Sequence, residues 1–253
     1  SASGTGSVTI NQIKTNSVTG EVIPGKIGGT NFLNSILIGH STTGTLSSAD
    51  NNVGVGINTL SNITSGDDNI AIGTYAGRQI TNGGKNTVIG TSSGRLITSG
   101  GSNIGIGGQS LYGITTQNHN IAVGAYSVYR AAGAGNIGIG SNSLQEVVGG
   151  AYNIGLGYFA GDNITTGSGN VIIGSIDADS ATGDKQLIIA DGVNGSVAWL
   201  KGDSAGLLTI TGGEVIPGKL GGTNFTNSLL IGHSTTGTLN AAERNTGVGI
   251  GAL

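Results

Sequence analysis

The sequence predicts an all-β protein, a parallel β-roll or β-helix solenoid of 17-residue repeats, on the basis of three observations. A short motif returns at a fixed interval, its positions alternate between branched and small residues, and the composition disfavours helices. Glycine supplies 51 of the 253 residues. Glycine and β-branched residues both lower helix stability, so helical repeats are disfavoured and parallel β-coils remain.

The chain divides into four expected regions. Residues 1–34 form a module with the motif Val-Ile-Pro-Gly-Lys, and residues 35–174 carry the 17-residue repeats. Residues 175–211 form a connector that breaks the interval, and residues 212–253 hold a second copy of the module and the start of a second repeat array. The array breaks off within its motif at residue 253, so we expect the chain to be a piece of a longer polypeptide.

Each repeat opens with an asparagine, followed by Ile, Val or Thr, then a usually small residue, then Ile, Val or Leu, and a glycine. The anchor asparagines are Asn52, Asn69, Asn86, Asn103, Asn120, Asn136, Asn153 and Asn170. A 17-residue unit cannot bury its own apolar face, so the units are expected to stack in register. Stacked asparagines hydrogen-bond to one another, which predicts that these residues form a structural ladder.

The alternation within the motif indicates a strand with one buried face. We expect the Ile and Val columns to form that face, because β-branched residues suit a packed pleated surface. Small residues allow close approach of another backbone, so the small columns are expected to face a neighbouring chain. These columns include Gly54, Gly105, Gly138 and Gly155 in the strand and Ser93, Ser110 and Ser127 after it.

One step in the interval is shorter than the others. Asn120 and Asn136 are 16 residues apart instead of 17. The residues after Asn136 nevertheless follow the strand motif in the usual order. We therefore expect the strand at 120–124 to keep its register and the loop at 126–135 to absorb the deletion. That loop is expected to present Tyr126, Tyr129 or Arg130 outward as a contact patch. A neutral shortening of the loop is the alternative.

Composition excludes several functional classes. The chain has no cysteine, 9 % charged residues and a net charge of −3 without a basic cluster, which predicts no nucleic-acid partner. No run of 18 apolar residues is present, which predicts no membrane-spanning helix. No repeat column is acidic, so the sequence predicts no enzyme, no catalytic residue and no cofactor.

Two groups leave ion binding open, although no metal site is predicted. His40 and His233 occupy the same position in the two module copies, where a polar turn residue is the simpler interpretation. Three carboxylates of the connector, Asp177, Asp179 and Asp184, are spaced loosely like an oxygen-ligand loop. They fail the EF-hand pattern, because its glycine and glutamate positions hold Thr182 and Ile188.

Four short segments carry a resemblance to known fibrous proteins. Asn69–Gly73 and Asn120–Gly124 resemble the head repeats of trimeric autotransporter adhesins of the YadA type. The repeats, followed by Ile-Ala-Asp-Gly at 189–192 and Trp-Leu-Lys-Gly-Asp at 199–203, look like tail-fibre and other fibrous virion proteins of bacteriophages. The resemblance covers residues 35–203 and implies a homotrimeric fibre. The 17-residue period is longer than is usual in adhesin heads, so the resemblance leaves the shape of the coil open.

The expected function is a structural segment of a phage tail fibre or virion appendage, located outside the cell. It would form a stiff shaft and a surface for attachment to a host-cell receptor, with copies of itself as partners. A bacterial surface adhesin or extracellular filament is the alternative. An ice-binding solenoid is a third interpretation, because Thr64, Thr81, Thr98, Thr115 and Thr165 share one column.

Overall fold

The computed structural model describes residues 12–14, 22–40, 42–210, 218–220, 229–231 and 246–248. The chain separates into two units, Ser1–Thr209 and Ile210–Leu253, and each is described by itself. Every regular element in the described residues is a strand, and none of these residues belongs to a helix able to cross a membrane. The strands of the first sheet are β1 (Gln12–Lys14), β2 (Val22–Ile27), β3 (Ile36–Ile38), β4 (Val53–Val55), β5 (Ile70–Ile72), β6 (Thr87–Ile89), β7 (Ile104–Ile106), β8 (Ile121–Val123), β9 (Ile137–Ile139), β10 (Ile154–Leu156), β11 (Val171–Ile173), β12 (Leu187–Ala190), β13 (Ala198–Gly202) and β14 (Leu208–Ile210).

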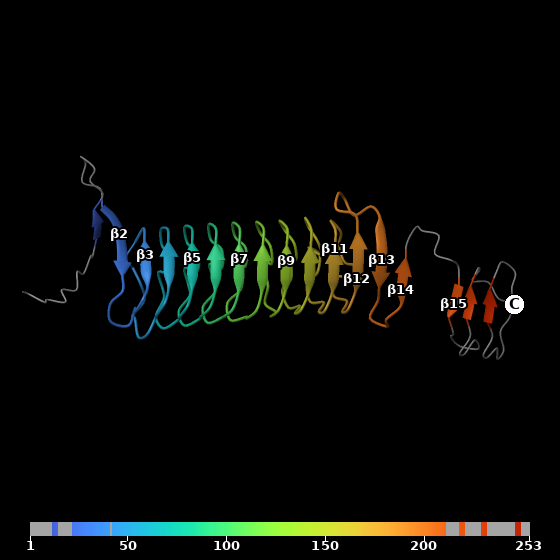
Figure 1. Cartoon of the computed structure of the whole chain (residues 1–253), viewed down its shortest axis with the longest axis horizontal. Helices are drawn as coiled ribbons and strands as arrows, with labels where there is room; N and C mark the ends of the chain where they lie inside the picture. The colour runs from blue at the N-terminus through green and yellow to red at the C-terminus, as the bar shows by residue number, and fades with distance from the viewer. Residues whose placement is uncertain are drawn as a thin grey trace, which may run out of the picture. The chain divides into compact units, whose positions relative to one another are not determined.

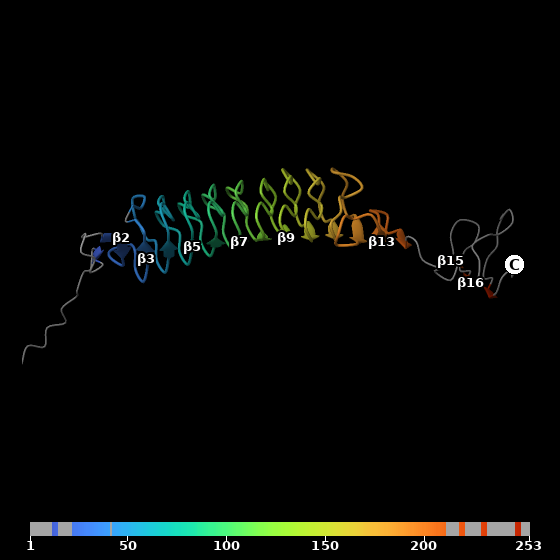
Figure 2. The same cartoon turned by 90° about the horizontal axis from the view of Figure 1, so that it is seen from above.

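The first unit is a parallel β-solenoid, as the sequence predicts. Each turn contributes one strand of three residues, or four in β12, and strands β3–β12 stack in sequence order with parallel pairing (Figure 1). The strands line one side of the coil and the intervening turns form the other (Figure 2). Pairing joins equivalent residues of successive repeats, for example Ile104 with Ile121 and Gly105 with Ala122. The expected stacking in register is confirmed.

Antiparallel strands close both ends of the parallel stack. Strand β2 pairs antiparallel with β3, and β13 pairs antiparallel with β12. The stack also extends further than the 17-residue interval indicates, because β12 pairs parallel with β11. Gln186 stands there in place of the anchor asparagine, 16 residues after Asn170. The segment expected to be a connector therefore begins with one more turn of the solenoid.

The two faces of the strands are the reverse of the expected ones. In the parallel stack, the central residue of each strand, which is small in most of them, is buried inside the coil, whereas the residues on either side of it point outward. Ile106 and Ile139 keep 40 % and 44 % of their surface exposed. The prediction that Ile and Val columns form the buried face is wrong for this chain. The core instead consists of the small central column, residues of the turn after each strand and an apolar column eleven residues after the anchor. That column, which includes Ile63, Ile80, Ile97, Ile114 and Ile164, lies in the segment leading back to the next strand, which we call the return segment.

The small columns are likewise inside the coil. Gly105 lies where an added Cβ would be 2.7 Å from Ser93 Oγ and 3.1 Å from Leu111 Cδ1. Ser93 and Ser127 are buried and donate to the carbonyl oxygens of Gly105 and Gly138 in following strands. The expectation that these columns face a neighbouring chain is therefore wrong, because the interior of this narrow coil already requires small residues.

In several turns, a small residue at the strand centre is matched by a large turn residue six positions later, and a large one by glycine. Where the strand centre is Gly105 or Gly138, the turn supplies Leu111 or Leu144 in the left-handed region, with φ of 53° for both. Where the strand centre is Val88, the turn supplies glycine at Gly94, whose added Cβ would meet Val88 Cγ1 at 2.6 Å. The core is filled to a similar level in each of these turns although its sequence changes.

The second unit repeats the start of the first. Its strands are β15 (Gly218–Leu220), β16 (Leu229–Ile231) and β17 (Thr246–Val248). Strand β15 pairs antiparallel with β16, and β16 pairs parallel with β17. The pairing of Gly218 with Ile231 reproduces that of Gly25 with Ile38, at the offset of 193 residues that relates the two modules.

Candidate functional site

The anchor asparagines form a buried ladder along the coil. All eight are fully buried. In the regular turns, each Oδ1 accepts the backbone N–H and the side-chain amide of the next anchor, as Asn86 Oδ1 does from Asn103 at 3.1 and 3.0 Å. The remaining amide proton of Asn103 goes to Gln117 O at 2.9 Å. The ladder continues to Gln186, whose Nε2 lies 3.2 Å from Asn170 Oδ1. The side-chain donors and acceptors of the anchors are therefore engaged in hydrogen bonds that join one turn of the coil to the next.

Hydroxyl groups repeat the same pattern on the return segment. Thr64, Thr81 and Thr98 each donate to the carbonyl oxygen of the next threonine of the column, over 3.0–3.2 Å. The column that suggested an ice-binding surface thus takes part in the hydrogen bonding of the coil itself.

The irregular turn keeps its strand register. Ile121 pairs with Ile137 as in the other repeats. The ladder changes here, because Asn136 Nδ2 donates to the carbonyls of Gly133 and Gly150 instead of to Asn120.

The side chains expected to form a contact patch lie in the same turn. Tyr126 is 40 % exposed, and the Arg130 side chain is 56 % exposed and pairs with Glu146 at 3.0 Å. Tyr129 is half-buried and stacks on Tyr112, with ring centroids 5.1 Å apart.

The branched columns form a continuous apolar surface, which we call the outer sheet face. It consists of Ile36, Ile38, Val53, Val55, Ile70, Ile72, Thr87, Ile89, Ile104, Ile106, Ile121, Val123, Ile137, Ile139, Ile154, Leu156, Val171, Ile173, Leu187 and Ile189. Only Thr87 among them is polar, and none is charged. Ten strands at about 4.8 Å spacing give a strip roughly 43 Å long and 10 Å wide. This is a large apolar patch for an isolated chain.

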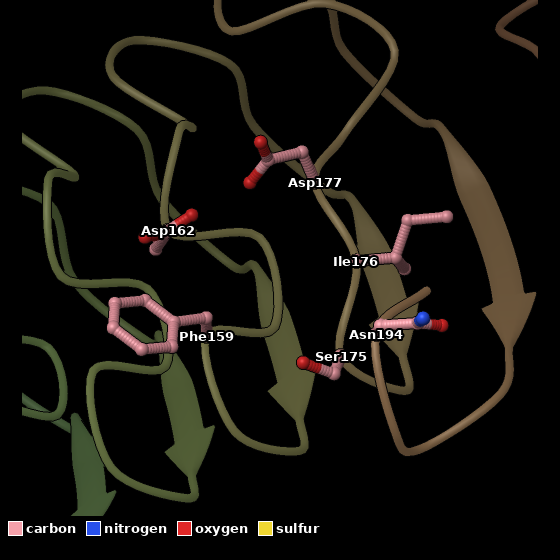
Figure 3. A pocket seen from close by; sticks show the side chains of 6 residues that line it. All are labelled: Phe159, Asp162, Ser175, Ile176, Asp177 and Asn194. Carbon is pink, nitrogen blue, oxygen red and sulfur yellow. The ribbon is translucent and has the colours of Figure 1, made fainter. Parts of the chain in front are cut away.

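A pocket of about 430 Å³ lies where the regular turns end. Phe159 and Asp162 of one turn, Ser175, Ile176 and Asp177 of the next and Asn194 of the following loop line it (Figure 3). The Asp177 carboxylate is directed toward Asp162, and Phe159 lies beside Asp162.

The two carboxyl groups of the pocket share a hydrogen bond. Burial, the bond to Asp177 and the negative charges of Asp177 and Glu146 raise the pKa of Asp162 to about 7. Near neutral pH this pair therefore shares a proton. The lining contains no cationic side chain, and the site is acidic with one aromatic wall.

The carboxylates that suggested an ion site are not brought together. Asp179 pairs with Lys201 at 2.6 Å, Asp184 accepts from Ser168 N at 2.7 Å, and Asp177 faces Asp162. Among the described residues, no group of three His, Cys, Asp or Glu side chains is placed to hold a metal ion.

His40 has a structural environment. It is 8 % exposed and its Nε2 donates to Thr59 O at 2.6 Å. Burial lowers the pKa of His40, opposed by this bond. Its counterpart His233 lies outside the described residues.

Sequence reasoning missed the role of Asp191, which belongs to the Ile-Ala-Asp-Gly motif. Its Oδ1 accepts the backbone N–H groups of Val193, Asn194 and Gly195, and its Oδ2 accepts that of Val197 at 2.7 Å. These bonds, led by those to Asn194 and Val197, lower the pKa of Asp191 to about 2. The carboxylate thereby orders the loop between β12 and β13.

Comparisons with protein-family models, with curated proteins and with solved structures give no match to this chain.

Proposed function

We propose that the chain is a structural segment of a bacteriophage tail fibre or related virion appendage, in which three copies form a stiff shaft outside the cell. The observation that supports it is the outer sheet face, because burial of such a surface drives association. Association through this face would place the turns on the outside of the assembly. The number three rests on the resemblance of the repeats to trimeric fibre proteins.

The hydrogen bonding of the coil suits a shaft. Successive regular turns are joined by the parallel ladder, the asparagine ladder and the hydroxyl column, so bending the rod would lengthen many bonds at once. The second unit begins another stack with the same strand register. Tandem solenoids lengthen the shaft, and their outward turns, including Tyr126 and Arg130, offer the surface for contact with a host receptor.

The test is the mass of the chain in solution. Light scattering should give three times the 24.8 kDa of one copy. Ile106→Lys places a charge on the outer sheet face, where a monomer tolerates it, and should yield a folded monomer by circular dichroism. Thr116→Lys, at an exposed turn position, is the control and should remain trimeric. A monomeric mass for the unaltered chain would overturn the proposal.

A further inference from the structure

Nine residues after each anchor asparagine stands a row of side chains whose charge changes from one end of the coil to the other. We call it the turn ridge; its members are Ser61, Arg78, Arg95, Tyr112, Tyr129, Gln145, Asp162 and Asp179. Two arginines stand near one end, with Arg95 5.0 Å from the Tyr75 ring centroid and 5.9 Å from that of Tyr112. Stacked tyrosines occupy the centre, and carboxylates follow.

The order of these residues allows two antiparallel copies of the ridge to pair, with the basic end of each copy facing the acidic end of the other. A two-fold axis between the turns of Asn103 and Asn120 would place Tyr112 opposite Tyr129 of a second copy running antiparallel. The same axis places Arg95 opposite the turn that carries Gln145 and Glu146. It places Arg78 opposite Asp162. Both charged ends then meet the opposite charge, and each contact occurs twice, as in an isologous interface.

The acidic pocket has the chemistry that a guanidinium group requires. Asp162 and Asp177 offer carboxylate oxygens in close proximity, and Phe159 provides an aromatic wall. Arginine pairs with carboxylates through several N–H donors and packs on aromatic rings. No cationic side chain lines this pocket, and Arg130 is paired with Glu146. An arginine arriving from another copy would supply the positive charge that the lining of this pocket lacks.

We propose that the turn ridge is a docking surface for a second copy of this chain in antiparallel orientation, with Arg78 and Arg95 of each copy facing the acidic end of the other. The ridge from Arg78 to Asp162 spans five repeat steps, roughly 24 Å. That length is short for a stable interface, so one contact is weak. A long shaft offers many such contacts, and their combined strength joins fibres side by side.

Cysteine cross-linking tests the orientation, because the chain contains no cysteine of its own. Tyr112→Cys lies half a step from the axis, so the two copies of residue 112 are offset along the coil by only about one strand spacing, ~5 Å, and face each other across the interface. Gln145→Cys is the matched control in the same column, also half-buried, and its two copies are about 14 Å apart. Disulfides need Cα atoms within about 7 Å, so only the first variant should form covalent dimers under mild oxidation. Equal cross-linking of both variants would indicate a parallel contact and overturn the proposal.

Charge exchange tests the pairing. Sedimentation at low salt should show species of twice the basic assembly mass, which disappear at high salt. R78E/R95E and E146Q/D162K should each lose this association, and an equimolar mixture of the two should recover it.

Thermal melts identify any variant that fails to fold, and Gln79→Glu, beside the ridge, should behave as the unaltered chain. An absence of salt-sensitive association, or a mixture that stays unassociated, would overturn the proposal. At high salt the ridge contact is lost, so the mass measured there reports only on association through the outer sheet face. A monomeric mass at high salt would therefore contradict the proposed trimer without bearing on the ridge.

Discussion

The Asn69 side-chain amide donates to Asn52 Oδ1 at 3.0 Å, and the Asn69 backbone N–H donates to the same oxygen at 3.0 Å. One oxygen therefore holds both the main chain and the side chain of the following turn. Because the same relationship recurs in most turns, loss of one asparagine leaves polar groups unpaired on both sides of it.

Replacement of one anchor should lower stability. Asn103→Ala removes the acceptor for two N–H donors of Asn120 and the donor to Asn86, all in a buried site. A buried unsatisfied polar group costs about 1–3 kcal/mol, so the melting temperature should fall clearly. Asn82→Ala, at an exposed turn position, is the control and should melt as the unaltered chain. An unchanged melt for Asn103→Ala would contradict the ladder.

A larger residue at a strand centre should destabilise the coil. Gly105→Leu must place its side chain where Ser93 Oγ and Leu111 Cδ1 already lie within 3.1 Å of the Cβ position. Overpacking of this kind costs about 1–3 kcal/mol. The loss should appear in denaturant unfolding both of the otherwise unaltered chain and of the chain that also carries Ile106→Lys. Gly108→Ala is the matched control, because an added Cβ there meets no atom within 4 Å. Equal stability of the two variants would show that residue 105 is not in the core.

The stability of the acidic turn should depend on pH. The pKa of Asp162 is raised from 3.8 to about 7, so the folded state holds its proton more firmly than the unfolded state does. This contribution is complete below the unfolded pKa and is lost as the pH rises through about 7. The melting temperature should therefore decline toward alkaline pH, and Asp162→Asn should reduce that decline. A decline of the same size in Asp162→Asn would exclude this carboxyl as its source.

The loop that follows β12 should depend on pH in the opposite sense. The pKa of Asp191 is lowered to about 2, so its bonds to the loop stabilise the fold above the ordinary carboxyl pKa of 3.8. They are lost as the pH falls through about 2. Asp191→Ala should increase amide hydrogen exchange at Val193–Val197 at neutral pH. Unchanged exchange in that loop would contradict the assigned role.

The sequence predicts that the strands stack, but it does not predict which face of the strands is buried inside the coil. Regular spacing of Asn103 and Asn120 is sufficient to place strands in register, because identical neighbours pair best. Alternation of Ile104, Gly105 and Ile106 defines two faces, yet it does not say which one is inside. That choice depends on the width of the coil, which the return segment fills with residues such as Ile114.

The candidate sites could be predicted only in part. Tyr126 and Arg130 stand out because their repeat is one residue short. The pocket around Asp162 and the turn ridge give no constant signal, since the residue at the ridge position changes along the array from arginine to tyrosine to aspartate. The extra turn at β12 is hidden because Gln186 replaces asparagine after a shortened step.

The most direct test of the shaft is a spin label on the outer sheet face. Ile106→Cys, the only cysteine in such a chain, can carry a nitroxide in every copy of the assembly. If three sheet faces meet at the fibre axis, the labels lie close together and their spectrum shows strong dipolar broadening, which dilution with unlabelled chains removes. A label at Thr116→Cys, on an outward turn, should show none. An undiluted Ile106→Cys spectrum free of broadening would contradict the assembly through the outer sheet face.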